Sequence, residues 1–348
     1  MELSKYGFNI LQIETVAKCN MACSFCPYPL KEDKSSMLNM DLITKLIDQI
    51  DPYDPGFEYI TFSQFNEPLL DNRIFDIVKY AKSKNFKIQL ITNGLLLNKE
   101  KNVKGIIENG IQLKISLQVL DSTKHKDARG LNLEIESYLK TIINFLIKVA
   151  GHKNAVTVDI GSNFVGSIYK YHLRKILGLT VGDPSIPRNL KSTVSYLKKY
   201  LYLFYEIADK KYKDQLNKFI NDKKLFDSDY IKQEGFKIFD NVIIKIKPFF
   251  YGRRIKDFYP INNNFACNSQ ILGVLADGNV VPCCLAYDDS ISLGKISQSN
   301  TLEKILQNNK FLNDLRTPGA EKHLTCKKCF GEPTKRGAYI RNTLNYIK

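Results

Sequence analysis

Three cysteines lie within eight residues near the start of the chain: Cys19, Cys23 and Cys26, in the string KCNMACSFCPYP. Thiolate ligands in proteins select iron–sulfur clusters, zinc or Cu(I). Compact cysteine spacings are typical of iron–sulfur clusters. A four-iron cluster held by only three cysteines leaves one iron free for a ligand that is not protein. A zinc site completed by a distant residue and a reactive thiol cluster are the alternatives at this point.

Five further cysteines lie near the C-terminus: Cys267, Cys283, Cys284, Cys326 and Cys329. Between the first two, an apolar run, an Asp-Gly-Asn turn at 277–279 and a returning Val-Val pair predict a β-hairpin. Such a hairpin would bring Cys267 and Cys283 together, and the closing CxxC pair could complete a four-thiolate site. Taken alone, this region favours structural zinc. Cys284 is left over, either as a bystander or as a replacement for Cys283.

The composition is that of an ordinary globular protein. The 348 residues are 44% hydrophobic and 25% charged with only 8 Cys, which argues against a secreted, disulfide-stabilised domain. No apolar stretch approaches the ~20 residues of a membrane span. The N-terminus carries charges where a signal peptide needs an apolar run. We therefore expect a cytoplasmic protein with reduced thiols and no membrane partner.

The formal net charge of +15 favours an anionic partner. Because the lysines are scattered, with no run of five or more like charges, we do not expect that partner to be nucleic acid. A phosphate-bearing small substrate remains compatible with the charge. Tyr251, Arg253 and Arg254 are candidates for gripping such an anion, with solvated linker residues as the ordinary alternative.

Strands and helices alternate along the chain and must position these side chains. Apolar runs predict strands at 9–15, 58–62, 87–91, 112–117, 155–160 and 239–246, and helical periodicity predicts helices that include 38–50, 133–149 and 193–212. The βα alternation with short links favours a parallel α/β sheet, either open or closed into a full or partial barrel. We interpret the stretch at about 165–235, which has no clear strand, as a helical insertion.

Polar residues follow the second, third and fourth predicted strands, as the cysteine loop follows the first: Asn66 and Glu67, Thr92 and Asn93, and Ser116 and Gln118. In parallel α/β sheets the active-site groups gather at the carboxyl ends of the strands. We therefore expect these groups at one rim. A turn or strand-end hydrogen bond is the structural alternative for Asn93 and Ser116.

The spacing Cx3Cx2C, with Phe25 just before the last cysteine, resembles the signature of the radical S-adenosylmethionine (radical SAM) family. In that family the free iron of a 4Fe–4S cluster chelates the methionine end of S-adenosylmethionine. An electron from the cluster then cleaves the sulfonium to give a 5′-deoxyadenosyl radical. The resemblance covers about residues 8–160 and implies a partial (β/α)6 barrel, with the backbone of Phe25 near the adenine.

The same resemblance implies which residues bind S-adenosylmethionine. Asn66-Glu67-Pro68 is similar to the Gly-Glu-Pro motif that binds the methionine amino group, with asparagine in place of the usual glycine. Ser116 is similar to the fourth-strand residue that contacts the ribose or the carboxylate. Arg129 is similar to the arginine that pairs with the carboxylate. The expected set is Phe25, Asn66, Glu67, Pro68, Thr92, Asn93, Ser116, Gln118 and Arg129.

Behind such a core, the C-terminal segment resembles the SPASM/twitch auxiliary-cluster domain of the same family. The features that carry this resemblance are Cys267, the Gly278-x4-Cys283 spacing, the Leu293-Gly294 turn and the closing pair Cys326 and Cys329. The implied organisation is a radical SAM core over 1–260, insertion included, and a small hairpin-plus-helix auxiliary domain over 261–348.

The cysteine count implies a single auxiliary cluster. A full SPASM domain has seven cysteines and two clusters, whereas this chain has no candidate ligand after Cys329. A cluster with four protein ligands cannot bind substrate without losing one of them, so electron transfer is its expected role. The resemblance therefore implies two 4Fe–4S clusters and S-adenosylmethionine as cofactors, and a flavodoxin- or ferredoxin-like protein as electron donor.

The resemblance implies a radical SAM oxidoreductase that dehydrogenates or epimerises a carbon centre. The truncated cysteine set and the positive charge favour a sugar-like or nucleotide-linked small substrate, and Cys284 is a candidate hydrogen donor to the substrate radical. A peptide- or protein-modifying maturase is the alternative within the family, although the first strand begins near residue 9 and leaves no room for an N-terminal peptide-binding domain. A non-catalytic zinc- or RNA-binding protein is the alternative of another class.

Overall fold

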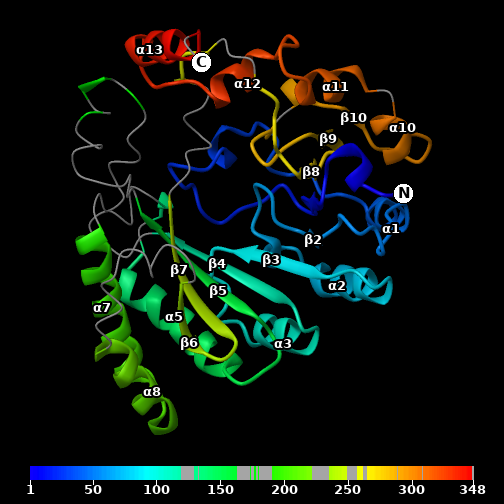
Figure 1. The fold of residues 1–348 in the computed structure, drawn as a ribbon. Coiled ribbons are helices and arrows are strands. Elements are labelled where there is room, and N and C mark those ends of the chain that lie inside the picture. The colour runs from blue at the N-terminus through cyan, green and yellow to red at the C-terminus, as the bar shows by residue number, and fades with distance from the viewer. Residues whose placement is uncertain are drawn as a thin grey trace.

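The structure of the protein is a computed structural model. It describes residues 1–118, 129–131, 133–162, 173, 176, 177, 179, 190–221, 235–248, 257–261, 265–287, 289–307 and 309–346. Figure 1 shows the arrangement of these segments. Among them, no helix is long and apolar enough to span a lipid bilayer.

A mixed sheet organises the fold (Figure 1). In the described part of the chain it has ten strands, in the order β10-β9-β8-β1-β2-β3-β4-β5-β7-β6. They are β1 (Ile10–Ile13), β2 (Tyr59–Thr61), β3 (Ile88–Thr92), β4 (Gln112–Gln118), β5 (Val156–Ser162), β6 (Phe236–Phe239), β7 (Val242–Pro248), β8 (Ile271–Val274), β9 (Asn279–Val281) and β10 (Gly294–Lys295). The strands from β8 to β7 in this order are parallel, and the pairs at the two edges are antiparallel. The sheet is not closed, so the expected partial barrel is confirmed.

Helices connect and cover the strands. They are α1 (Met40–Asp48), α2 (Ile74–Ser83), α3 (Glu100–Glu108), α5 (Ile135–Val149), α7 (Leu190–Ile207), α8 (Lys210–Asn221), α10 (Leu302–Leu306), α11 (Lys310–Arg316), α12 (Leu324–Cys329) and α13 (Lys335–Tyr346). The first four are amphipathic, and their apolar stripes pack in one core with the strands. In Figure 1 the helices α1, α2, α3 and α5 line the outside of the curved sheet. The helices α10 to α13 lie with β8 to β10 in the upper part of the same view.

The two faces of the central strands differ in chemistry because successive side chains alternate. Leu11, Ile60 and other apolar side chains pack on the helices. Gln12, Thr61 and Gln89 stand in one row of paired residues across β1, β2 and β3. Each of the three carries a buried side-chain oxygen with no hydrogen-bond partner among the described residues. The sheet therefore presents a polar face opposite its helix-covered face.

The predicted C-terminal hairpin is confirmed as β8 and β9. Its turn is local chemistry: the Asp277 carboxylate accepts a hydrogen bond of 3.0 Å from Asn279 N, and Gly278 has a φ of 90°. The hairpin does not stand apart, because β8 pairs in parallel with β1 and continues the core sheet. The division at residue 260 stays a prediction.

Two predicted elements are wrong in their extent. The strand expected at 239–246 is a hairpin of β6 and β7, so Phe239 ends an antiparallel strand rather than beginning a parallel one. Asp240 and Asn241 form the tight turn that the apolar pattern concealed. The helix expected at 193–212 is two helices, α7 and α8, with a break at Ala208 and Asp209.

The candidate anion-binding residues Tyr251, Arg253 and Arg254 lie outside the described residues, as does much of the proposed insertion.

Candidate functional site

The cysteine loop begins directly after β1. Cys23 is buried, and Cys19 and Cys26 are partly buried. The Sγ atom of Cys26 accepts a hydrogen bond of 3.4 Å from Tyr28 N, and the Cys26 amide donates to the Cys23 carbonyl at 3.1 Å. Burial is the main cause of the raised pKa of Cys19, and the nearby Glu67 carboxylate and the thiols of Cys23 and Cys26 add to it. The loop therefore gathers the three predicted ligands at one strand end.

The buried thiols of the cysteine loop are difficult to ionise without a nearby positive charge. Burial raises the pKa of Cys19 and of Cys26 to about 12, so the thiolate form that ligates metal needs positive charge nearby. A guanidinium, that of Arg129, lies within hydrogen-bond reach of Cys23. Among the described residues no three Cys, His, Asp or Glu side chains have the geometry to hold a single ion. Three soft donors of this kind are suited to an iron–sulfur cluster.

Glu67, at the end of the loop after β2, links the second and third strands to the cysteine loop. It precedes the short 3-10 helix η3 (Pro68–Leu70), which has Pro68 at its first position. The Glu67 carboxylate accepts hydrogen bonds of 2.8 Å from Thr92 Oγ1 and from Asn93 N. Its backbone amide donates to the Lys18 carbonyl at 2.8 Å. Burial raises the pKa of Glu67 to about 7 despite these donors.

Asn93 extends this network to residues that the sequence did not indicate. Its side chain donates a hydrogen bond of 2.7 Å to the side-chain oxygen of Asn20, inside the cysteine loop. Its carbonyl accepts a hydrogen bond from the hydroxyl of Tyr138 on α5. The only sequence signal for Tyr138 was a polar tip in the apolar stripe of a helix, which is common in cores.

Arg129 lies under the cysteine loop and is 1% exposed. It donates to Cys23 Sγ at 3.5 Å, to the Ser116 carbonyl and to the Tyr138 hydroxyl at 3.3 Å. The guanidinium also lies 5.9 Å from the centre of the Phe25 ring. Its Nε atom is buried and has no partner among the described residues. An arginine fork with a free donor fits the carboxylate that the resemblance assigns to it.

The next residue fixes the backbone beside the cysteine loop. Gly130 has a φ of +66°, and a Cβ atom there would lie 2.4 Å from the Ala22 carbonyl oxygen. The Ala22 amide in turn donates to the Arg129 carbonyl at 3.2 Å. Only glycine combines this dihedral with this close approach, so the 129–130 segment is held against the cysteine loop.

Three of the predicted residues, Asn66, Ser116 and Gln118, form hydrogen bonds close to their own position in the chain. The side-chain amide of Asn66 accepts a hydrogen bond from Gln64 N at 2.9 Å and donates one to the Phe62 carbonyl at 3.1 Å, so this side chain closes its own turn. Gln118 lies beyond a register shift with a φ of 60°, and its side chain donates to Ser116 Oγ at 3.0 Å. The structure thus places Ser116 at the rim, with its carbonyl on Arg129.

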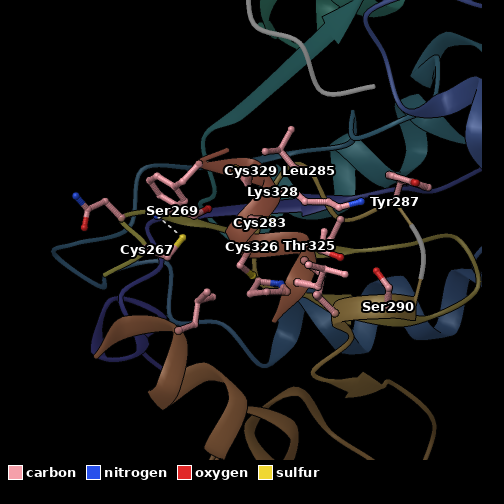
Figure 2. Close-up of a pocket in the computed structure, with 17 residues that line it drawn as sticks. Cys267, Ser269, Cys283, Leu285, Tyr287, Ser290, Thr325, Cys326, Lys328 and Cys329 are labelled. Atoms are coloured by element: carbon pink, nitrogen blue, oxygen red, sulfur yellow. Dashed lines mark hydrogen bonds between the residues drawn. The ribbon is translucent and has the colours of Figure 1, made fainter. Parts of the chain in front are cut away.

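The remaining predicted ligands surround one cavity of about 450 Å³, shown in Figure 2. Its wall includes Cys267, Cys283, Cys326 and Cys329. Most of the other lining side chains are apolar, and burial raises the pKa of Cys283 and of Cys329 to about 12. Four thiols around one cavity fit a fully ligated cluster. Cys284 is exposed and does not line the cavity.

An apolar cluster joins the two sets of cysteines. It contains Phe65, Leu275, Val281, Ala286, Ile291, Leu315 and Cys326. Cys26 of the N-terminal set packs on this cluster, and so do Cys267 and Cys283 of the C-terminal set. The ring of Tyr287 meets that of Phe65 edge to face at a centroid distance of 6.3 Å. The two candidate cluster sites therefore contact the same apolar cluster.

Residues 13–154 match the radical SAM superfamily, and residues 267–330 match the SPASM iron–sulfur cluster-binding domain. The chain is a radical SAM enzyme with a SPASM domain. Its cofactors are accordingly two 4Fe–4S clusters and S-adenosylmethionine.

This radical SAM enzyme is similar to several known proteins. It is 22% identical over 311 residues to the probable GTP 3',8-cyclase of Methanosarcina mazei. The matched region covers 87% of this chain and 86% of that protein. It is 28% identical over 153 residues to the tungsten-containing aldehyde ferredoxin oxidoreductase cofactor-modifying protein of Pyrococcus furiosus. That match covers 43% of this chain and 42% of that protein, so less than half the length of this relative is matched. The solved structure of histidine-tagged anSMEcpe with bound AdoMet shares the fold, with a TM-score of 0.50, 19% identity and coverage of 97% of this chain and 92% of that chain.

Proposed function

We propose that this radical SAM enzyme is an oxidoreductase that dehydrogenates or epimerises a carbon centre of a sugar-like or nucleotide-linked small substrate. The observation that carries the proposal is the apolar cluster between the two sets of cysteines, since Cys26 and Cys283 both pack on it. When bound, the clusters and S-adenosylmethionine supply the electron and the organic radical that remove hydrogen from an unactivated carbon. The side chains of the protein hold the cofactors in position and supply the charged groups that bind them.

At the N-terminal site, Cys19, Cys23 and Cys26 would hold the cluster that leaves one iron free. Glu67 would accept a hydrogen bond from the ammonium group of S-adenosylmethionine, because its carboxylate is already oriented by Thr92 and Asn93. Arg129 would pair with the carboxylate of the same molecule. Both groups are buried, which strengthens each charge interaction relative to water.

At the C-terminal site, the four lining cysteines would hold a cluster with no free iron. Such a site suits electron transfer, and Leu285, Ile291 and Leu315 give it an apolar lining. We further propose a flavodoxin- or ferredoxin-like electron donor. The cysteines are free thiols, which is compatible with the reducing cytoplasm as the setting of the reaction.

The test is anaerobic purification and reconstitution. We expect a brown protein with about eight irons per chain that cleaves S-adenosylmethionine when reduced. The Cys26→Ala variant should lose that cleavage and keep the auxiliary iron. Colourless wild-type protein that carries zinc would contradict the proposal.

Cys284→Ala separates the two reaction types. Cys284 is exposed beside the auxiliary site, where a thiol could donate hydrogen to a substrate radical. An epimerase that uses this thiol loses turnover in the variant, whereas a dehydrogenase retains it. The measurement is product formation in deuterated water, because a thiol donor places solvent deuterium in the product.

A further inference from the structure

The hydroxyl group of Tyr138 lies between a strand end and Arg129. Tyr138 is on α5 and is 3% exposed. Its hydroxyl donates a hydrogen bond to the Asn93 carbonyl and accepts one of 3.3 Å from Arg129 Nη2. Burial raises the pKa of Tyr138, so the hydroxyl keeps the proton that it donates to Asn93. This one group therefore acts as a donor on one side and as an acceptor on the other.

Arg129 connects this hydroxyl to the cysteine loop. Its Nη2 atom donates to the Tyr138 hydroxyl and to the Ser116 carbonyl, and its Nη1 atom donates to Cys23 Sγ at 3.5 Å. Because a guanidinium is planar and rigid, two anchors on Nη2 also fix the direction of Nη1. The contacts of one nitrogen thus aim the other nitrogen at the sulfur of a predicted cluster ligand.

The backbone around Asn93 fixes the position of the Tyr138 hydroxyl. The Asn93 amide donates to the Glu67 carboxylate at 2.8 Å, so the residue that accepts from Tyr138 is also held on its other side. Gly94 follows with a φ of +84°, and a Cβ atom there would lie 3.2 Å from Cγ1 of Ile142. Ile142 is one turn after Tyr138 on α5 and is buried. Because α5 packs this closely on the strand-end turn, the hydroxyl stays in place when the arginine moves.

Tyr200 allows a matched comparison with Tyr138. It lies on α7, which packs against α5 (Figure 1), and it is 2% exposed. Its hydroxyl is also buried but has no hydrogen-bond partner among the described residues. The two tyrosines therefore have similar burial and differ in whether the hydroxyl joins two other groups. Replacing Tyr200 by phenylalanine removes a hydroxyl without breaking a hydrogen bond within the described part of the chain.

We propose that Tyr138 is a positioning residue that holds the Arg129 guanidinium on Cys23 and thereby raises the reduction potential of the N-terminal cluster. This inference rests on the proposed role of Cys23 as a cluster ligand. Reduction adds one electron, and hence one negative charge, to the cluster and its thiolates. A cation that donates a hydrogen bond to a ligand sulfur stabilises the reduced form more than the oxidised form. Tyr138 acts through Arg129 and needs no contact with the cluster itself.

The test is the midpoint potential of the N-terminal cluster in Tyr138→Phe. The anaerobic, reconstituted holoenzyme is titrated with dithionite in the absence of S-adenosylmethionine and followed by electron paramagnetic resonance. Cys326→Ser, which should carry only the N-terminal cluster, identifies the signal of that cluster. We expect one-electron reduction to become at least about threefold and up to about tenfold less favourable in Tyr138→Phe. The midpoint potential then becomes more negative by up to about 59 mV.

Two controls separate positioning from a general loss of structure. Tyr200→Phe should leave the potential of the N-terminal cluster unchanged. The auxiliary cluster of Tyr138→Phe should keep its wild-type potential, because Arg129 does not line the four-cysteine cavity. The iron content of both variants should stay near eight per chain, since each keeps the aromatic ring and every cysteine.

Three results would overturn the inference. The first is a shift in Tyr138→Phe that is smaller than expected or in the opposite direction. The second is an equal shift in Tyr200→Phe. The third is loss of the N-terminal cluster from Tyr138→Phe, which would make the role of the hydroxyl structural.

The same titration separates this inference from the proposed function. Wild-type holoenzyme without the signal of an N-terminal cluster contradicts the proposed function. A wild-type signal whose potential does not respond to Tyr138→Phe contradicts this inference alone.

Discussion

The Nη1 atom of Arg129 donates a hydrogen bond of 3.5 Å to Sγ of Cys23, a residue 106 positions earlier in the chain. The same guanidinium reaches the Ser116 carbonyl and the Tyr138 hydroxyl, and it is 1% exposed. A single buried cation thus contacts the cysteine loop, the end of β4 and α5. This arrangement makes Arg129 a positioning group for the loop as well as a candidate ligand of S-adenosylmethionine.

Arg129→Lys tests this double role. A lysine keeps the charge but loses the planar fork, so we expect the affinity for S-adenosylmethionine to fall about 10- to 100-fold. The iron content should remain near that of the wild type, since the positive charge stays beside Cys23. Equilibrium binding and iron analysis of the same preparation check the two halves, and an unchanged affinity would remove Arg129 from the binding site.

Glu67 predicts a pH dependence. Burial raises its pKa to about 7, so below pH 7 the folded protein holds the protonated carboxyl, which cannot pair with an ammonium. We expect the affinity for S-adenosylmethionine to fall up to tenfold per pH unit below that value. Above about pH 8 the affinity should fall again, because the α-amino group of the ligand loses its proton.

The variant Glu67→Gln should weaken binding and remove the acidic limb of this profile while the alkaline limb remains. Glu108→Gln, on the exposed side of α3, is the control and should keep both limbs. An acidic limb that persists in Glu67→Gln would assign it to another group.

The C-terminal cysteines Cys326 and Cys284 should differ in their effect on iron content when each is replaced. Cys326 lines the four-thiol cavity, and Cys284 is exposed outside it. We expect Cys326→Ser to lower the iron content from about eight to about four per chain, whereas Cys284→Ser keeps about eight. The measurement is iron analysis with electron paramagnetic resonance of the reduced protein. Loss of iron from Cys284→Ser instead would make Cys284 the ligand in place of Cys283.

Replacing Gly130 or Gly151 by alanine should change the stability of the protein by different amounts. Gly130 and Gly151 have φ values of +66° and +81°, but an added Cβ at Gly130 would meet the Ala22 carbonyl, whereas nothing lies within 4 Å at Gly151. Gly151→Ala should therefore lose only about 1 kcal/mol of unfolding free energy. Gly130→Ala should lose about 1–3 kcal/mol more and load less iron at the N-terminal site. Urea unfolding and iron analysis check both, and equal losses would contradict the close approach at Ala22.

Local patterns in the sequence were sufficient where the determining contacts are close along the chain. The spacing of Cys19, Cys23 and Cys26 and the Asp277–Asn279 turn involve neighbours a few residues apart, so their chemistry could be read directly. The βα alternation gave the parallel sheet for the same reason. The pattern failed at Asp240 and Asn241, because an apolar run on both sides of a two-residue turn looks like one strand.

Contacts between segments that are far apart in the sequence could not be predicted from local patterns. The sequence by itself determined the cysteine sets, the strand-end motifs and the order of the elements, because each depends on residue types at short spacing. Only the tertiary structure paired β8 with β1, set Arg129 against Cys23 and brought the Ala276 amide to the Glu14 carboxylate. Those relationships join segments more than a hundred residues apart, and burial and charge at such a meeting point arise only when the chain has folded.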